Sequence, residues 1–417
     1  MKKEKFVIYT LGCKLNFSES SDISRQLKEQ GFFYSDDTPD IIIVNSCAVT
    51  ATAVKKARNM VSGLHRQFPE ASIIVMGCYT ALEPEILHKW PGVNAVFGNE
   101  DKANIIPYLL DKACPIAPKF IPAFSSGDRT RSFLKIQDGC DYYCSYCTVA
   151  RARGESRSDS IENILKQLCQ ISLLQMKEVI LTGVNIGDFG RKNGESFLNL
   201  LKAIEERQIV ERVRISSIEP NLLSDEIIDL VGNSKILMPH FHIPLQSGSN
   251  AVLLDMKRRY NRELFKEKVL KIKSIMPDAC IAIDVISGFP SESDQDFEDS
   301  IHFIEGLPVS YLHVFTYSKR KNTPAGNMPQ LKDSVKKERT IRLLRLSEEK
   351  KNRFYKQHLG EQRLVLFESD EHEGMMYGFT DNYLRVKLTY NLDWINRIVP
   401  VKLDANCFAP ELQIISQ

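Results

Sequence analysis

The sequence predicts an α/β protein built from three units: an N-terminal parallel α/β three-layer domain, a central open (β/α)6 barrel and a C-terminal five-stranded antiparallel β-barrel. A length of 417 residues exceeds one compact domain and fits two or three. Short apolar strand-like segments alternate with helical segments over most of the chain, which is typical of parallel βα units. After residue 359 the helical segments stop and short strands follow one another. We therefore place domains at 1–114, 132–358 and 359–417, with a linker at 115–131.

The N-terminal domain carries a cysteine after each of its first three strands. The expected strands are Phe6–Thr10, Ile41–Val44, Ser72–Met76 and Val93–Phe97, and helices are expected from Ser18 to Gly31, from about Thr50, over Glu83–Lys89 and within Asp101–Asp111. Cys13, Cys47 and Cys78 follow the first three strands. Because the carboxyl ends of parallel strands line one crevice, the three thiols are expected to converge there. Free cysteines are often small buried hydrophobes, but three at equivalent positions favour a metal site.

The segment 115–131 is rich in proline and small residues, as expected of a linker, and a second βα series follows it. Its expected strands are Phe133–Gln137, Glu178–Thr182, Arg212–Ser216, Phe241–Leu245, Ile281–Ile286 and Leu312–Tyr317. Its expected helices are Ser158–Gln175, Phe197–Arg207, Ser224–Val231, Asn261–Ile275, Asp294–Glu305 and one from about Asp333. Six repeats, against the eight of a closed barrel, predict an open barrel with its site at the carboxyl ends of the strands.

Five short strands are expected in the last domain: Arg363–Phe367, Met375–Phe379, Leu384–Thr389, Arg397–Lys402 and Cys407–Ile414. Small antiparallel barrels of this kind often bind oligonucleotides, but they also occur as structural caps. Residues 361–417 hold five basic and nine acidic side chains, whereas residues 332–358 hold ten basic and four acidic ones. A nucleic-acid surface would therefore be assembled from several segments, with the basic helix as one contributor.

The most specific motif is Cys140-Asp-Tyr-Tyr-Cys144-Ser-Tyr-Cys147, directly after the first barrel strand. The N-terminal sequence shows no signal-peptide pattern, so ten cysteines favour metal binding or catalysis over disulfides. A structural zinc site takes four protein ligands, and this motif supplies three, with no histidine close behind it. Three thiolates can hold three irons of a 4Fe–4S cluster and leave the fourth iron open for a substrate or cofactor. We interpret the motif as an iron–sulfur site, with zinc as the alternative.

The stretch Phe133-Leu-Lys-Ile-Gln-Asp-Gly-Cys140, with the two cysteines that follow, resembles the core motif of radical S-adenosylmethionine (SAM) enzymes. Cys13, Cys47 and Cys78 match the N-terminal domain of the methylthiotransferases within that group, and the C-terminal barrel resembles their TRAM domain. The resemblance covers essentially the whole chain and identifies the barrel as the partial TIM barrel of the radical SAM fold.

Within that family, Tyr9-Thr-Leu-Gly-Cys13-Lys-Leu-Asn16 resembles the branch that modifies N6-threonylcarbamoyladenosine at position 37 of tRNA. The isopentenyladenosine branch usually starts Gly-Cys-Gln-Met-Asn, and the ribosomal-protein branch Gly-Cys-Pro-Lys-Asn. Two segments depart from the family pattern at the rim of the site. Val149-Ala150 stands where Pro-Tyr is common, and Ser291-Glu-Ser293 where Gly-Glu-Thr is usual.

The resemblance implies a radical reaction that uses two clusters. Carbon 2 of adenine carries a C–H bond that no side-chain acid or base removes at neutral pH, so cofactors must supply the reactivity. The family implies that the open iron of the cluster on Cys140, Cys144 and Cys147 binds SAM and that one electron cleaves it to methionine and a 5′-deoxyadenosyl radical. A second 4Fe–4S cluster, on Cys13, Cys47 and Cys78, would hold the sulfur that is methylated and transferred to C2.

Residues at the ends of the later barrel strands are candidates for binding SAM. They are Gly183, Asn185, Ser217, Glu219, Gln246 and Gly288. Each fits a loop-shaping role as well as a ligand-binding one. Arg151, Arg153 and Arg157 lie just past the cluster motif and are candidates for phosphate contacts with an anticodon loop, with ordinary surface charge as the alternative.

Three functions remain open from the sequence. The favoured one is a cytoplasmic, monomeric enzyme that methylthiolates C2 of N6-threonylcarbamoyladenosine-37, with the tRNA anticodon loop, an electron donor such as a flavodoxin or ferredoxin, and a sulfur source as partners. The same chemistry could act on isopentenyladenosine-37 or on an aspartate of a ribosomal protein. The third is a non-catalytic RNA-binding iron–sulfur or zinc sensor. No apolar run approaches the roughly 18 residues of a membrane helix, so no membrane partner is expected.

Overall fold

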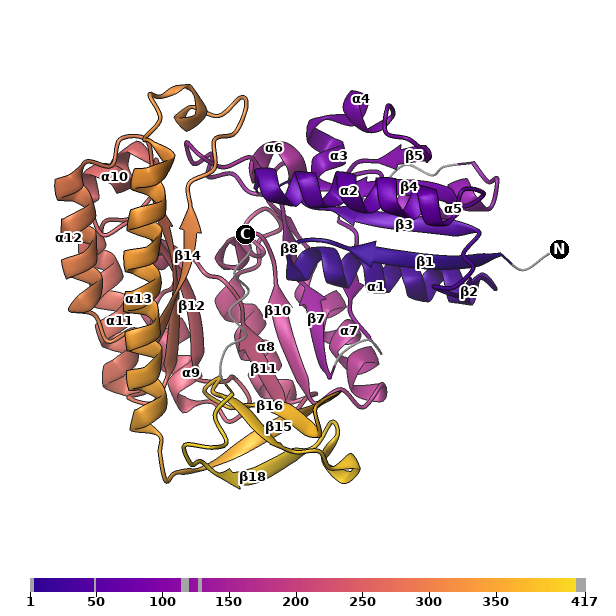
Figure 1. Ribbon diagram of the computed structural model, residues 1–417. Coiled ribbons are helices and arrows are strands. Elements are labelled where there is room, and N and C mark those ends of the chain that lie inside the picture. The colour runs from indigo at the N-terminus through magenta and orange to yellow at the C-terminus, as the bar shows by residue number, and fades with distance from the viewer. Residues whose placement is uncertain (1–3, 49, 114–119, 127–129, 410–417) are drawn as a thin grey trace.

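The N-terminal domain is a five-stranded parallel sheet, in the order β2-β1-β3-β4-β5, with helices on both faces (Figure 1). Its strands are β1 (Lys5–Thr10), β2 (Phe33–Tyr34), β3 (Ile41–Ser46), β4 (Ser72–Gly77) and β5 (Val93–Phe97). Its helices are α1 (Lys14–Glu29), α2 (Ala51–Gln67), α3 (Cys78–Leu82), α4 (Pro84–Leu87), η1 (Lys102–Asn104) and α5 (Ile105–Leu109). Alternate residues of the strands pack on α1 and α5 on one face and on α2 and α4 on the other, which confirms the three-layer domain. The computed structural model describes residues 4–48, 50–113, 120–126 and 130–409.

Two helices of this domain begin earlier than the sequence pattern predicts. Helix α1 starts at Lys14, with Cys13 as its N-cap, rather than at Ser18. The helix expected over Glu83–Lys89 is instead the pair α3 and α4, and α3 starts at Cys78 itself. The glycines that precede the two cysteines adopt positive φ angles of +103° and +109°, so the chain turns from strand to helix within one or two residues. As a result, both cysteines lie at the first turn of a helix.

The central domain contains six parallel strands with helices on their outer face, as the sequence predicts. The strands are β7 (Arg131–Lys135), β10 (Glu178–Thr182), β11 (Arg212–Ile215), β12 (His240–Gln246), β13 (Cys280–Ser287) and β14 (Tyr311–Thr316). The helices are α6 (Val149–Arg153), α7 (Ile161–Leu173), η2 (Ile186–Asp188), α8 (Phe197–Arg207), η3 (Pro220–Leu222), α9 (Asp225–Asn233), α10 (Asn250–Asp255), α11 (Arg262–Ile275), α12 (Asp294–Glu305), η4 (Ala325–Asn327) and α13 (Asp333–Gln357). Two parallel bridges, Val213 to Leu237 and Ser217 to His242, join the β11 edge to β12. Alternate strand residues pack against the helices in one large apolar core, so the remaining residues of each strand face the barrel interior.

Three short strands accompany the barrel. In the segment expected to be a linker, β6 (Ala123–Phe124) pairs antiparallel with β7 and extends that edge of the sheet. Past the end of β7, β8 (Gln137–Asp138) pairs with β9 (Arg157–Ser158). This small pairing brackets the cysteine motif, because the motif lies between its two strands.

The C-terminal domain is a curled antiparallel sheet in the order β17-β16-β15-β18, with a further bridge from Val386 to Phe408. Its elements are β15 (Gln362–His372), β16 (Met375–Thr380), β17 (Arg385–Thr389), η5 (Leu392–Trp394) and β18 (Ile398–Lys402). The bridge at Phe408 falls at the start of the fifth expected strand, and residues 410–414 of that strand lie outside the described residues.

The C-terminal sheet packs under the amino ends of the barrel strands (Figure 1). Arg214 on β11 donates hydrogen bonds of 2.7 Å to the backbone carbonyls of Thr380 and Asp381, and the ring of Tyr383 stacks on that of His240, 4.2 Å between centroids. The opposite end of the barrel, where the strands terminate, faces the N-terminal domain. Over the described residues, no helix is both long and apolar enough to cross a membrane.

Candidate active site

The loop of residues 140–147 is anchored at the carboxyl end of β7. Gly139 enters it with a φ of +70°, and a Cβ at this position would lie 1.9 Å from the carbonyl oxygen of Glu155. Only glycine fits such a close approach of two backbone segments. The amide of Ser145 donates to the carbonyl of Met256, 3.1 Å away, so the middle of the loop is held against the end of α10. The loop is therefore positioned from both sides by backbone contacts.

Two of the three thiols of this loop (the barrel triad: Cys140, Cys144 and Cys147) have donors aimed at sulfur. Arg258 Nη1 lies 3.0 Å from Cys144 Sγ, and the amide of Val149 lies 3.4 Å from Cys147 Sγ. Burial, together with the neighbouring thiols, raises the pKa of Cys140 to about 12 and the pKa of Cys147 to about 11. Such thiols stay protonated at neutral pH until a metal displaces the protons. Converging thiols with N–H donors to sulfur fit the ligation of an iron–sulfur cluster.

Gly139→Ala is expected to prevent assembly of a cluster on the barrel triad, because the new Cβ would force the carbonyl of Glu155 away and displace the loop. Gly194→Ala is the matched control, since Gly194 also has a positive φ, +78°, but its Cβ would meet open space. Both variants carry the backbone penalty of about 1 kcal/mol for a left-handed alanine, and only the first adds the clash. Iron content after anaerobic reconstitution compares the two. Equal iron in both variants would contradict the argument.

Three further cysteines (the N-terminal triad: Cys13, Cys47 and Cys78) lie at the carboxyl ends of β1, β3 and β4. The last paired residues of β3 and β4 immediately precede Cys47 and Cys78, so these two leave the sheet at the same level. A Cβ on Gly12, next to Cys13, would lie 3.0 Å from Cys47 Sγ. Cys13 is exposed, whereas Cys47 and Cys78 are buried. The structure thus brings the three residues to one edge of the sheet, as the sequence predicts.

The spacing of the thiols distinguishes a cluster from a single ion. Among the described residues, neither triad has its three Sγ atoms within 4.8 Å of one another, and no described cysteine forms a disulfide. One tetrahedral zinc ion would need such close spacing. In a 4Fe–4S cluster each thiolate binds its own iron, so the sulfurs stand farther apart. Neither triad therefore has the spacing of a preformed zinc site, and the three-thiolate donor set of each fits an iron–sulfur cluster.

A buried set of charged side chains joins the two cysteine loops. Arg153, at the end of α6, donates to Asn16 Oδ1 at 2.7 Å, to Glu19 Oε1 at 3.1 Å and to Asp138 Oδ1 at 2.9 Å. Lys135 Nζ lies 3.0 Å from both Glu19 Oε1 and Asp138 Oδ2. Although burial raises the pKa of Glu19 and of Asp138, the surrounding cations lower both well below the usual carboxyl range. Since Asn16 lies three residues after Cys13 and Asp138 two before Cys140, this set (the interface network) fixes one cysteine loop relative to the other.

The three arginines expected at an RNA surface have different environments. Arg153 is buried and its donors are engaged in the interface network, so it does not offer a phosphate contact in this structure. Arg157 is partly buried and bonds Asp138 Oδ2 at 3.1 Å. Arg151 is exposed on α6, where one guanidinium nitrogen donates to the backbone carbonyl of Asn322 at 3.4 Å. No local sequence pattern indicates this division, because the acidic partner Glu19 of Arg153 lies 134 residues away.

One of the predicted cofactor-binding loops is held by a residue that the sequence analysis did not single out. The side-chain oxygen of Gln137 accepts from the amides of Val184 and Asn185 at 2.9 and 2.8 Å, while its Nε2 donates to the carbonyl of Gly139 at 2.8 Å. Gln137 thereby ties the loop after β10 to the cysteine loop. The same side chain confines Gly183, because a Cβ added there would lie 2.9 Å from Gln137 Oε1. Asn185 is buried and its Oδ1 has no partner among the described residues, which fits a group that awaits a ligand.

The remaining strand-end residues surround the barrel triad to different degrees. Glu219 pairs with Arg258, the same residue that donates to Cys144, so it belongs to the surroundings of the cysteine loop. Gln246 is buried with a φ of +65°, a strained backbone for a residue other than glycine. Gly288 packs against α13, where a Cβ would lie 2.6 Å from Lys336 Cγ. Ser217 forms an isolated parallel β-bridge with His242 of β12. The sequence motifs did not indicate Arg258, because its role depends on a contact 114 residues away.

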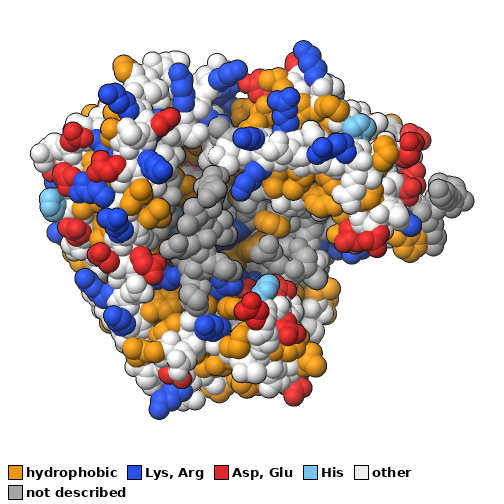
Figure 2. All heavy atoms as spheres, in the orientation of Figure 1, with side chains coloured by type: hydrophobic (Ala, Val, Ile, Leu, Met, Phe, Trp, Pro, Cys, Tyr) orange, Lys and Arg blue, Asp and Glu red, His pale blue; other side chains and the backbone are white. Residues whose placement is uncertain are grey.

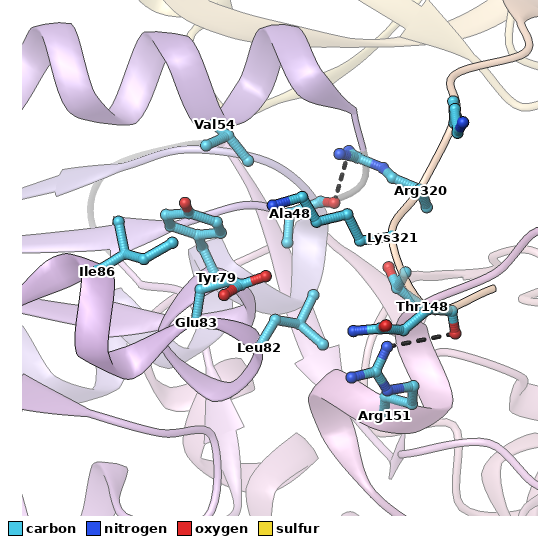
Figure 3. A pocket seen from close by; sticks show the side chains of 12 residues that line it. Ala48, Val54, Tyr79, Leu82, Glu83, Ile86, Thr148, Arg151, Arg320 and Lys321 are labelled. Atoms are coloured by element: carbon cyan, nitrogen blue, oxygen red, sulfur yellow. Dashed lines mark hydrogen bonds between the residues drawn. The ribbon is translucent and has the colours of Figure 1, made fainter. Parts of the chain in front are cut away.

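A pocket of about 290 Å³ opens beside both triads (Figure 3). Its wall includes Ala48, Tyr79 and Thr148. Ala48 and Tyr79 directly follow two cysteines of the N-terminal triad, and Thr148 directly follows the last cysteine of the barrel triad. Four cations line its rim from the barrel side, and we call them the basic notch: Arg151, Lys319, Arg320 and Lys321. Arg320 donates to the carbonyl of Ala48 at 2.7 Å and thereby connects the loop after β14 to the N-terminal domain. Figure 2 shows Lys and Arg side chains on both sides of this junction.

Comparison with known proteins agrees with this architecture. Residues 5–98 match the model of the Uncharacterized protein family UPF0004, and residues 134–304 match that of the Radical SAM superfamily. The radical SAM methyltransferase TsrM from Kitasatospora setae superposes with a TM-score of 0.59 at 13% identity, over 78% of this chain and 77% of that one. This likeness supports the fold alone.

Curated relatives extend over nearly the whole chain. The threonylcarbamoyladenosine tRNA methylthiotransferase MtaB of Bacillus subtilis is 37% identical over 95% of this chain and 92% of its own, and that of Thermotoga maritima is 35% identical over 92% and 91%. The tRNA-2-methylthio-N(6)-dimethylallyladenosine synthase of Pelotomaculum thermopropionicum is 30% identical over 96% and 95%. With identity at this level along more than nine tenths of each chain, the protein belongs to the radical SAM methylthiotransferase family.

Proposed function

We propose that this protein is a radical SAM enzyme that methylthiolates C2 of N6-threonylcarbamoyladenosine at position 37 of tRNA. The observation that carries the proposal is the pair of cysteine triads at facing ends of two domains, joined through the buried interface network. The relatives named for threonylcarbamoyladenosine reach 37% identity, against 30 to 32% for those named for dimethylallyladenosine, which favours the first substrate.

Each triad would hold one 4Fe–4S cluster, and the barrel cluster would also bind SAM. When bound, these groups supply the radical that removes the C2 hydrogen and the sulfur and methyl group that replace it. The chain's own residues position them. Gln137 holds the loops on either side of the barrel triad, Asn185 offers an unpartnered amide oxygen, and Arg258 donates to the sulfur of Cys144. Ser217, Glu219, Gln246 and Gly288 would contribute further contacts with SAM from the ends of the later strands.

The three domains would divide the work. We assign the N-terminal cluster to residues 1–114, the radical core to 132–358 and RNA contacts in part to the TRAM-like sheet at 359–417. Reductive cleavage of SAM consumes an electron, so a donor such as a flavodoxin or ferredoxin is needed. Each modified nucleoside gains one sulfur atom, so the enzyme also needs a sulfur source. The enzyme would act as a monomer in the cytoplasm.

The function is tested with reconstituted enzyme, SAM, a chemical reductant and tRNA that carries threonylcarbamoyladenosine but no methylthio group. Mass spectrometry of the digested nucleosides is expected to show the methylthio derivative of that nucleoside. A second tRNA that carries isopentenyladenosine tests the related activity in parallel. Product on the second tRNA alone would reassign the substrate, and SAM cleavage on neither would favour the non-catalytic sensor.

The basic notch is the surface that we expect to contact the RNA backbone. Alanine at Arg151, Lys319 and Lys321 removes three exposed cations beside the pocket, whereas Arg320 is left in place because it bonds the N-terminal domain. Each lost phosphate contact reduces the slope of log affinity against log salt by about 0.7 to 1. The triple variant is therefore expected to bind tRNA at least tenfold more weakly at low salt, with a slope smaller by about 2 to 3.

Alanine at Lys202, Arg207 and Lys235 gives a control with the same change in net charge on exposed positions around α8. Its tRNA affinity is expected to match the wild type in a filter-binding titration at several salt concentrations. Equal losses in the two triple variants would show that only net charge matters and would remove the notch from the RNA interface.

A further inference from the structure

The guanidinium group of Arg258 has a partner on each of its three nitrogens. Nη2 pairs with the carboxylate of Glu219, in the loop after β11, and Nε donates to the hydroxyl of Tyr260 at 3.2 Å. Nη1 lies 3.0 Å from Cys144 Sγ and 3.4 Å from the hydroxyl of Tyr146, both in the cysteine loop. The side chain therefore connects the sulfur of a barrel-triad cysteine to a neighbouring strand end and to a buried tyrosine.

The partners of Arg258 are themselves fixed in the barrel. The hydroxyl of Tyr260 lies 2.6 Å from the carbonyl of Pro244 on β12. Ser145 Oγ donates to the carbonyl of Asp255, 2.7 Å away, which joins the cysteine loop to the end of α10 just ahead of Arg258. The guanidinium group and the cysteine loop are thus anchored to the same end of the barrel. Because both are anchored, the N–H group on Nη1 is oriented towards sulfur by the chain itself.

The environment of this contact makes it strong. The Arg258 side chain is 3% exposed, and hydrogen bonds from a charged donor are stronger where water is excluded. Glu219 balances the positive charge, so the pair as a whole adds no net charge beside the barrel triad. One nitrogen donates to Cys144, whereas Glu219 contacts another nitrogen of the same group. The effect of Arg258 on the sulfur is therefore local and depends on the orientation of the guanidinium group.

A donor to a ligand sulfur stabilises the two redox forms of a cluster unequally. Reduction adds one electron and takes up no proton, so the cluster and its ligand sulfurs become more negative. A hydrogen bond to such a sulfur therefore stabilises the reduced form more than the oxidised form, and it raises the reduction potential. The same bond has no redox consequence at a zinc site, because zinc does not change its oxidation state.

We propose that Arg258 acts through Cys144 as a positioning residue that raises the reduction potential of the cluster on the barrel triad, with Glu219 and Tyr260 holding its guanidinium group in place. The assignment rests on the proposed function, because it requires that this triad holds a 4Fe–4S cluster. Cleavage of SAM consumes one electron, which a low-potential one-electron donor delivers to that cluster. Arg258 makes this electron transfer more favourable.

The test measures one cluster at a time. The parent protein has alanine at the three N-terminal-triad positions, so that only the barrel triad binds iron, and its potential is titrated anaerobically without SAM or RNA. The reduced cluster is followed by electron paramagnetic resonance. Arg258→Met is expected to shift the reduction equilibrium towards the oxidised form by about tenfold, which lowers the potential of this one-electron couple by about 59 mV.

Arg258→Lys is a second variant that keeps a cation beside Glu219. An ammonium group lacks the planar fork that serves Glu219 and Cys144 from separate nitrogens, so the hydrogen bond to sulfur is weakened while the charge is retained. The shift is expected in the same direction as in Arg258→Met and to be smaller. If Arg258→Met fails to take up iron, the lysine variant alone decides.

Arg259→Met is the matched control, because Arg259 also contacts the cysteine loop, but its Nη2 donates to the backbone carbonyl of Asp141 at 2.9 Å. Its potential is expected to equal that of the parent. Unchanged potentials in Arg258 variants that carry about four irons, or an equal shift in Arg259→Met, would overturn the assignment. Loss of iron from both Arg258 variants but not from Arg259→Met would overturn it in favour of a structural role. A parent that binds iron but cleaves no SAM with excess reductant would instead remove the proposed function, and the potentials would still decide the role of Arg258.

Discussion

Alanine at Cys140, Cys144 and Cys147 together is expected to abolish cleavage of SAM and to halve the bound iron, from about eight to about four atoms per chain. The reason is the separation of the two triads: they lie on different domains and no cysteine is shared between them. The reciprocal variant, with alanine at the N-terminal triad, is expected to keep about four irons and the cleavage of SAM, but to yield no methylthio product. Iron, acid-labile sulfide and 5′-deoxyadenosine are measured after anaerobic reconstitution.

Cys169→Ala provides the matched control, since Cys169 is an exposed thiol on α7, remote from either triad. It is expected to retain the full iron content and activity. If the wild type binds only about four irons and the barrel-triad variant binds none, the N-terminal cysteines do not hold a cluster. The methylthiotransfer assignment would then fail, although radical cleavage of SAM would survive.

The strands and helices of the barrel could be predicted from the sequence because each βα unit buries one apolar face on the same core. The expected segment Phe197–Arg207 coincides with α8, and Asp294–Glu305 coincides with α12. Both helices start behind a serine that caps them, which the sequence pattern contains. The start of α1 was missed because its cap is Cys13, which makes no side-chain cap hydrogen bond, and because the turn depends on the φ of Gly12.

The metal-binding role of the cysteines could likewise be predicted, because it is indicated by their local spacing and by their positions directly after strands. The residues that hold the loops in place could not. In the sequence, Gln137 and Arg258 cannot be distinguished from ordinary polar residues. Only in the folded protein does Gln137 bind the loop after β10 and Arg258 donate to Cys144. Arg153 was expected at an RNA surface because it lies in a short basic run. Its burial depends on Glu19 in another domain, a contact that no local pattern encodes.

Arg153→Met is expected to destabilise the association of the two domains by about 1.5 to 3 kcal/mol, the usual contribution of buried hydrogen bonds to charged groups. Arg153 is 2% exposed, and its removal takes one set of donors from Glu19 and Asp138, which keep their pairs with Lys102, Lys135 and Arg157. The folded state lowers the pKa of both carboxyl groups, with burial opposing and the surrounding cations dominating. Their stabilising contribution is therefore fully present above the unfolded carboxyl pKa of about 4 and is lost only as the pH falls through the lower folded values. Urea unfolding at pH 7 measures the full effect.

Arg157→Met is the control, because Arg157 also bonds Asp138 but is partly exposed, and its loss should cost about 1 kcal/mol or less. A difference between the two variants would show that burial, rather than the count of ion pairs, determines the strength of this interface. The same network fixes Asn16 and Asp138, so Arg153→Met is also expected to alter the magnetic coupling between the two reduced clusters, which Arg157→Met should leave unchanged. Equal stability and equal coupling in both variants would mean that Lys102 and Lys135 alone hold Glu19 in place and that Arg153 does not set the distance between the two cysteine loops.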